Sequence, residues 1–178
     1  FLPTQASLRP DLTSKEHIMN RLSRVMSQIE RLPKGMQPAA RSFVLGRIIR
    51  FAGTASCRVE TLQPETCVIR LKNRRKVQNH IGSVHAAAMA LLAESATGFM
   101  AGMSVPDDRI LVIRSMELTY LKRASGDMTA VASFSEEQLA FIRDTPKGDI
   151  SVPVVITDET GTETVKAEMI WAWTPKKK

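Results

Sequence analysis

The sequence is poor in cysteine and in aromatic side chains. Two cysteines, Cys57 and Cys67, stand in 178 residues, and aromatic residues make up 5% of the chain. Two cysteines cannot build the disulfide framework of a small secreted protein or a cysteine-based zinc site, and they favour a reducing compartment. Hydrophobic residues at 43% and charged residues at 24% are typical of a folded domain, whose core is expected to be aliphatic.

Carboxylates are scarce in the first third of the chain. Residues 1–53 hold nine Lys/Arg and three Asp/Glu, whereas residues 54–178 hold sixteen and fifteen. This asymmetry favours an acidic partner or an anionic membrane surface for the first third, and not a nucleic-acid groove across the whole protein. An Arg-rich, acid-poor start is also typical of transit segments, so we expect the mitochondrial matrix or the matrix face of the inner membrane, with the bacterial cytoplasm as the alternative.

The chain shows no secretory signal and no convincing membrane span. Its one long apolar stretch, residues 86–103, is mostly alanine and is interrupted by Glu94, Ser95 and Thr97. Such a stretch is too weakly hydrophobic for a bilayer and indicates a core helix.

The first 53 residues are expected to form a basic arm with helices. Thr13 or Ser14 can cap a helix, and Glu16 completes a capping box with Thr13. An apolar stripe then predicts a helix over residues 14–32, and a second helix is expected over residues 38–51. The stripe is expected to pack outside the following domain, against a partner or a dimer rim; the alternative is a lid folded over its own sheet. Its members are Ile18, Leu22, Val25, Met26, Ile29 and Leu32.

From residue 54 the hydrophobic period becomes that of strands. Strands are expected over residues 55–62, 66–71, 109–121, 128–134, 150–158 and 163–173, with a long helix over 84–100. That helix is apolar on nearly all faces, so other structure must wrap it. The pattern predicts an α+β domain over residues 54–175, in which one curved antiparallel sheet encloses one long buried helix, followed by a basic tail at 176–178.

Glu94 is the most informative residue of that helix. It is the only carboxylate between Glu65 and Asp107, and it lies among apolar residues. Because burial of an unpaired carboxylate is costly, Glu94 should be paired, protonated or lining a cavity. It is either a structural carboxylate at a subunit interface or a catalytic acid or base.

The start of the helix offers a second chemical group. The first amides of a helix have no intrahelical partner and carry the positive end of its dipole. Amides at Ala86 or Ala87 could therefore hold a carbonyl oxygen as it becomes negative. Two histidines nearby, His80 and His85, lack a carboxylate cluster and are poor evidence for a metal, so no metal site is expected.

These segments resemble a known family. Asn79-His80-Ile81-Gly82-Ser83-Val84-His85-Ala86, with Leu92-Ala93-Glu94-Ser95-Ala96-Thr97-Gly98 after it, resembles the hotdog-fold thioesterase superfamily. The likeness is closest to an uncharacterised branch related to the phenylacetate-pathway acyl-CoA thioesterases, and it covers about residues 55–174. Its strand end at residues 120–126 also resembles this branch. One departure is that Ala86-Ala87 replaces the usual glycine pair.

The resemblance implies roles for individual residues. Asn79 matches the residue that orients substrate or water, Ala86 the amide that polarises the thioester carbonyl, and Glu94 the catalytic carboxylate. Coenzyme A enters as part of the substrate, with no other cofactor. The expected substrate-binding residues around these three are Ser83, His85, Ala87, Arg74, Arg75, Lys122 and Arg123. Ser83 also suits a helix cap and His85 a structural hydrogen bond, while the four basic residues are either phosphate ligands or solvated.

Ala86 and Glu94 are too far apart to serve one carbonyl from one chain. Eight residues along a helix span about 12 Å. The amide and the carboxylate of one site are therefore expected from two subunits, and hotdog domains generally pair into dimers. We expect a homodimer or a heterodimer with another hotdog chain, and the pairing could extend to a tetramer.

Two functions remain open from the sequence. One is hydrolysis of an acyl-CoA or a similar acyl thioester, with Glu94 activating water or attacking directly. The other is a non-catalytic hotdog subunit in a larger, mitochondrial assembly, which the double alanine and the basic arm favour.

Overall fold

A computed structural model of the chain describes residues 19–177. The helices and strands alternate in the order α1–α3, β1–β2, α4, β3–β4, α5 and β5–β7. The helices are α1 Arg21–Ile29, α2 Gln37–Ile48, α3 Arg50–Ala55, α4 Ala86–Ser104 and α5 Glu136–Asp144, with a 3-10 turn η1 at Arg75–Val77. The strands are β1 Arg58–Leu62, β2 Thr66–Leu71, β3 Arg109–Tyr120, β4 Met128–Ser133, β5 Gly148–Ser151, β6 Val154–Asp158 and β7 Glu163–Pro175.

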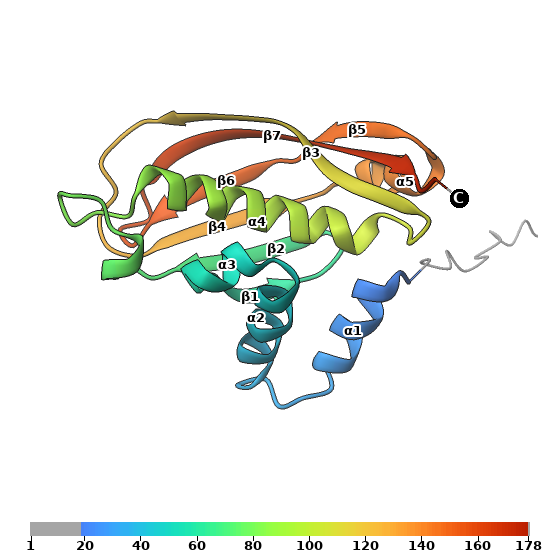
Figure 1. Ribbon diagram of the computed structural model, residues 1–178, viewed down its shortest axis with the longest axis horizontal. Helices are drawn as coiled ribbons and strands as arrows, with labels where there is room; N and C mark the ends of the chain where they lie inside the picture. Colours follow the sequence, from blue (N-terminus) through green and yellow to red (C-terminus); the bar gives the residue numbers. More distant parts are fainter. Residues whose placement is uncertain (1–18, 178) are drawn as a thin grey trace, which may run out of the picture.

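The seven strands form one antiparallel sheet. Its order is β1-β2-β4-β6-β7-β3, and β5 pairs with β7 beyond the end of β6. The sheet curves around α4, which lies along one of its faces, while α1 and α2 extend past the β1 side (Figure 1). This arrangement confirms the predicted fold class: a curved antiparallel sheet around one long helix, with an N-terminal helical extension, which is the hotdog fold.

Helix α4 is held in the sheet by small side chains and by one tryptophan. Ala93 and Ala96 are fully buried, and the indole Nε1 of Trp171 on β7 donates to Oγ1 of Thr97 at 2.9 Å. A Cβ at Gly98 would lie 2.5 Å from the Trp171 ring, so only glycine fits there. Although α4 is long and apolar enough to cross a membrane, 61% of its most apolar window is buried inside this fold. The prediction of a core helix is therefore confirmed.

Helices α2 and α3 cross at two glycines. A Cβ at Gly53 would lie 2.6 Å from the carbonyl oxygen of Gly46, so the two backbones touch. Helix α3 ends at Ala55, because Ser56 takes a left-handed conformation with φ 56° and its N–H bonds to the carbonyl of Gly53. The expected strand start at residue 55 is therefore wrong, and β1 begins at Arg58.

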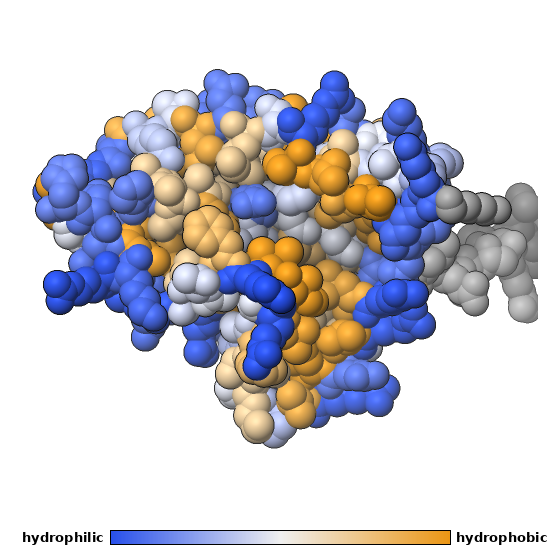
Figure 2. All heavy atoms as spheres, viewed as in Figure 1, coloured by the Kyte–Doolittle hydropathy of each residue, from blue (hydrophilic) through white to orange (hydrophobic). Residues whose placement is uncertain are grey.

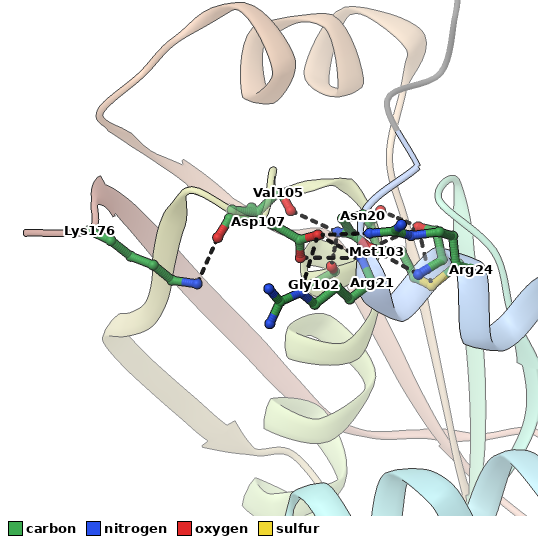
Figure 3. A network of polar contacts seen from close by, with 9 residues as sticks. Asn20, Arg21, Arg24, Gly102, Met103, Val105, Asp107 and Lys176 are labelled. Atoms are coloured by element: carbon green, nitrogen blue, oxygen red, sulfur yellow. Dashed lines mark hydrogen bonds and ion pairs between the residues drawn. The ribbon is translucent and has the colours of Figure 1, made fainter. Parts of the chain in front are cut away.

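Helix α1 docks against the end of α4 through Asn20. The Asn20 amide donates to the carbonyls of Gly102 and Val105 at 2.7 Å, while its Oδ1 caps α1 by accepting the N–H of Ser23 (Figure 3). One side chain thus closes the C-terminus of α4 and the N-terminus of α1. Asp107 adds a second contact by accepting the backbone N–H of Arg21.

Part of the predicted apolar stripe packs on its own chain, whereas Val25 and Leu32 stay exposed. Met26 and Ile29 are buried in the same core as the sheet, and Leu22 lies against Gly102 of α4. The expectation that this stripe packs outside the domain against a partner is therefore wrong for these residues, because α1 packs against α2 and α4 of its own chain. The expected helix start at Thr13 or Ser14, and Ile18 of the stripe, lie outside the described residues.

Two further features differ from the expected strand pattern. Residues 136–144 form α5, which no strand or helix prediction covered. The single strand expected over residues 150–158 is two strands, β5 and β6, interrupted at Val152 and Pro153. Proline lacks the N–H that a continuous ladder requires, which accounts for the break.

Candidate active site

A tight loop before α4 carries the motif residues. The Asn79 side-chain oxygen accepts the backbone N–H groups of Ile81 and Ser83, each at 3.1 Å. Gly82 takes a φ of 75°, a conformation that glycine adopts without strain. Asn79 thus shapes the loop with its oxygen, and its Nδ2 has no acceptor among residues 19–177.

Arg123 braces this loop from the far side. Its Nε donates to the hydroxyl of Ser83 at 2.9 Å, and its Nη2 donates to the carbonyl of Ile81 at 2.9 Å. Ser83 is buried. Arg123 and Ser83, two of the predicted substrate-binding residues, therefore lie together and hold the loop that leads into α4.

The first amides of α4 are not equivalent. His85 is the N-cap, and its Nδ1 accepts the N–H of Ala87 at 3.0 Å. The N–H groups of Ala88 and Met89 bond to the carbonyl of His85. Within the part of the chain that the structure describes, the N–H of Ala86 has no acceptor. A single donor at the positive end of α4 is therefore free to hold an oxyanion.

Tyr120 connects the end of β3 to the same turn. Its hydroxyl donates to the carbonyl of Ala86 at 3.0 Å. This contact orients the first peptide of α4. It was not predicted from the sequence, in which Tyr120 is the single tyrosine.

Glu94 lies two turns further along α4, on the strip that the sheet does not cover. It is half-buried, and Ala90, one turn before it, is also half-buried. No hydrogen bond or ion pair engages its carboxylate among the described residues. Sequence reasoning placed Glu94 in a helix buried all round, whereas the structure gives it a solvent-facing strip lined by small neighbours.

The basic residues fall into two groups. Arg74 donates to the carbonyl of Ala55 at 2.8 Å, so it anchors the end of α3, and Arg123 braces the loop. The side chains of Arg75 and Lys122 are exposed and make no hydrogen bond or ion pair within residues 19–177. Arg75 and Lys122 are therefore better placed than Arg74 and Arg123 to bind a phosphate group of coenzyme A.

A pocket of about 220 Å³ lies between α3 and the first turns of α4. Phe51, Thr54 and Ala55 come from α3, and His85, Ala87, Ala88 and Leu91 come from the start of α4. The pocket therefore adjoins the turn that carries the free amide. Phe51 and Thr54 were not among the predicted site residues, since no motif marks them.

The two cysteines take no part in this site. Burial raises the pKa of the Cys57 thiol to about 11 and that of Cys67 to about 12. Both thiols are free and protonated at neutral pH. No group of three or more His, Cys, Asp or Glu side chains that could hold a metal ion occurs in residues 19–177.

Comparison with known proteins places the chain in a family. The family model described as "Domain of unknown function (DUF4442)" matches residues 38–173, which run from α2 into β7. A search of curated proteins finds no match.

Solved structures show the same fold over most of the chain. A structural-genomics crystal structure is 28% identical, with a TM-score of 0.70, and the match covers 87% of this chain and 99% of that chain. A Pseudomonas aeruginosa protein of unknown function, described as a probable thioesterase, is 23% identical with a TM-score of 0.69, covering 82% and 97%. A Haemophilus influenzae thioesterase is 11% identical with a TM-score of 0.61, covering 74% and 88%.

Proposed function

Because the chain belongs to the DUF4442 family and has the fold of hotdog thioesterases, we propose that it hydrolyses acyl thioesters, with an acyl-coenzyme A or a similar acyl carrier as substrate. The observation that carries this proposal is the free N–H of Ala86. A thioester carbonyl oxygen becomes negative when a nucleophile adds to its carbon, and a preorganised amide at a helix N-terminus stabilises that charge. The neighbouring N–H of Ala87 already donates to Nδ1 of His85, so the N–H of Ala86 is the donor available to a substrate oxygen.

Glu94 supplies the base in this proposal. Its carboxylate takes a proton from a water molecule as the water oxygen bonds to the acyl carbon; direct attack by the carboxylate is the alternative route. Collapse of the tetrahedral intermediate breaks the carbon–sulfur bond, and the thiolate leaves and takes up a proton. The open strip around Glu94 favours this role, because small side chains leave room for the substrate beside the carboxylate.

The site is proposed to be shared between two subunits. Ala86 and Glu94 of one helix are about 12 Å apart, which is too far for one acyl carbon. Strand β3 ends the sheet and, among residues 19–177, pairs on one side only, with β7. Exposed Ile110, Val112 and Met116 lie on this strand, and apolar side chains gather along it above α4 in Figure 2.

An open strand edge with apolar side chains is a ready surface for pairing. We infer that two copies, or this chain and another hotdog chain, pair along β3. The two α4 helices then run side by side, and Glu94 of one chain faces the Ala86 turn of the other. A closed twofold dimer of this kind has two equivalent sites.

A non-catalytic hotdog subunit is the second candidate. It is favoured by Ala86 and Ala87, whose methyl groups stand where the resemblance expects glycines, and by the basic extension with its exposed Phe43 and Ile48. In that case the β3 edge and the extension would serve assembly alone.

One experiment separates the two candidates. Thiol release is measured from a panel of acyl-CoA substrates with the wild type and with Glu94→Gln. Turnover by the wild type that is lost in the variant supports the thioesterase. No turnover of any substrate by the wild type supports the non-catalytic subunit.

A further inference from the structure

We propose that the pocket between α3 and α4 holds the acyl group, so that α3, a part of the N-terminal extension, limits the length of the acyl chain that the site accepts. This inference rests on the proposed function and names its substrate class: acyl groups of short to medium length. The motif before α4 does not predict a role for α3, because Phe51 and Thr54 lie more than 24 residues before that motif in the sequence.

The pocket adjoins the proposed reaction centre. His85, which caps α4, and Ala87, whose amide it holds, both line the pocket, and the free N–H of Ala86 lies between them in the chain. A thioester carbonyl bound at Ala86 can therefore place its acyl group in the pocket and its sulfur toward solvent. Exposed Arg75 and Lys122 remain outside for the coenzyme.

The lining suits a hydrocarbon chain. Six lining residues present carbon surface and four are polar; the apolar ones are Phe51, Ala55, Val77, Ala87, Ala88 and Leu91, and the polar ones are Thr54, Lys76, Gln78 and His85. Buried carbon surface favours an apolar group over one that needs hydrogen bonds. The acyl group is therefore expected to be a saturated chain or a single ring without charge.

The volume limits the length. An apolar cavity of about 150 Å³ holds one benzene ring, so a pocket of about 220 Å³ has room for a hydrocarbon group of roughly eight carbons. A chain of six to eight carbons fills this space, and a longer chain must leave it. Each methylene that fits is expected to raise kcat/KM about fourfold, which is the transfer free energy of one buried methylene expressed as a ratio.

Two contacts fix the position of α3 beside the pocket. Its backbone touches α2 at Gly53, and Arg74 bonds to the carbonyl of Ala55 at its end. Phe51 is 64% exposed although it lines the pocket, so its ring stands at the mouth with a bare apolar face. A bound acyl chain would cover that face.

The test is a chain-length profile. kcat/KM is measured for acetyl- to dodecanoyl-CoA with the wild type, Thr54→Phe and Phe51→Ala. Thr54 is exposed, so a ring there narrows the pocket without disturbing the core. Phe43→Ala is the matched control, because Phe43 is also 64% exposed but lies on α2, outside this pocket.

The wild type is expected to be best with hexanoyl- or octanoyl-CoA. Thr54→Phe should move the optimum to butyryl-CoA or shorter and lower kcat/KM for octanoyl-CoA at least tenfold more than it lowers kcat/KM for acetyl-CoA. Phe51→Ala should lower octanoyl-CoA turnover several-fold, and Phe43→Ala should match the wild type. An active enzyme whose profile is the same in Thr54→Phe would overturn this inference and leave the proposed function intact.

If no acyl-CoA is hydrolysed, the proposed function fails and the pocket is tested by binding. Calorimetric titration with octanoyl-CoA then compares the wild type with Thr54→Phe. Binding that Thr54→Phe weakens at least tenfold supports the acyl pocket. Equal binding by both, or none by the wild type, overturns it.

Discussion

The imidazole Nδ1 of His85 accepts the backbone N–H of Ala87 at 3.0 Å, and this one bond decides which amide of α4 is free. Without it, two neighbouring N–H groups would compete for a substrate oxygen. With it, His85 serves as the N-cap, and Ala86 alone presents a donor. His85 is therefore a positioning residue: by capping α4 it leaves the N–H of Ala86 as the free donor.

Replacement of His85 tests this capping role. His85→Ala should lower the free energy of unfolding by about 1 kcal/mol, the usual cost of a lost N-cap, and His85→Asn should recover most of it. The measurement is chemical denaturation of both variants. His80→Ala is the control, since His80 is exposed and makes no hydrogen bond among the described residues. Equal stability of His85→Ala and the wild type would contradict the cap.

The contact between Gly98 and Trp171 predicts a strong steric effect. A methyl group at Gly98 would lie 2.5 Å from the indole ring, so Gly98→Ala should destabilise the fold by about 1–3 kcal/mol. The matched control on the same helix is Gly102→Ala, whose Cβ meets Leu22 at 3.4 Å. That change should be neutral or stabilising, because alanine favours the helix by up to about 1 kcal/mol. Thermal unfolding of the two variants should rank them in this order, and the reverse order would refute the close approach.

Arg123 and Lys122 are adjacent but should behave differently. Arg123→Ala removes the two bonds to the loop before α4, so it should cost about 1 kcal/mol of stability and lower kcat. Lys122→Ala should leave the melting temperature unchanged and raise KM for acyl-CoA. That rise should shrink at high salt, because exposed charges are screened. Identical effects of the two changes on stability would show that the loop does not depend on Arg123.

The buried thiols predict a loss of stability at alkaline pH. The pKa of Cys57 rises from 9.0 to about 11 on folding because burial disfavours the thiolate. The protonated thiol thus stabilises the fold fully below pH 9. As pH rises from there toward 11, the unfolded thiol ionises first, and the free energy of unfolding falls by up to about 1.4 kcal/mol per pH unit. Denaturation of the wild type and Cys57→Ala across this range should show a shallower slope in the variant, and parallel curves would refute the effect.

The central part of the fold could be predicted from the sequence because its signals are local. Helix α4 can be recognised because it is apolar on nearly all faces, and β2, β3 and β7 can be recognised because apolar and polar residues alternate along them. These patterns do not depend on which other elements pack against the segment. Helix α5 also had a signal that was missed: Ser135 and Gln138 form a capping box, and Glu136 and Glu137 occupy its first turn. Short elements of this kind are easily taken for loops.

Other features depend on contacts between distant residues. One helix was expected over residues 38–51, whereas the structure has two, α2 ending at Ile48 and α3 running from Arg50 to Ala55, which cross at Gly46 and Gly53. Likewise, the bond from Tyr120 to Ala86 joins residues 34 positions apart. Glu94 was predicted as a candidate from its isolation in the sequence, but its open strip follows only from how the sheet leaves one side of α4 uncovered.

Complementation between two inactive variants tests the shared thioesterase site most directly. Glu94→Gln lacks the base and Asn79→Ala alters the loop that carries Ala86, so each homodimer should be nearly inactive. When the two chains are mixed and exchanged in equal amounts, half of the dimers are mixed and each holds one intact site. Thiol release from hexanoyl-CoA should then recover to about one quarter of the wild-type rate, as expected for a twofold dimer. A mixture no more active than the two separate variants would contradict a site built from Glu94 of one subunit and the Ala86 turn of the other.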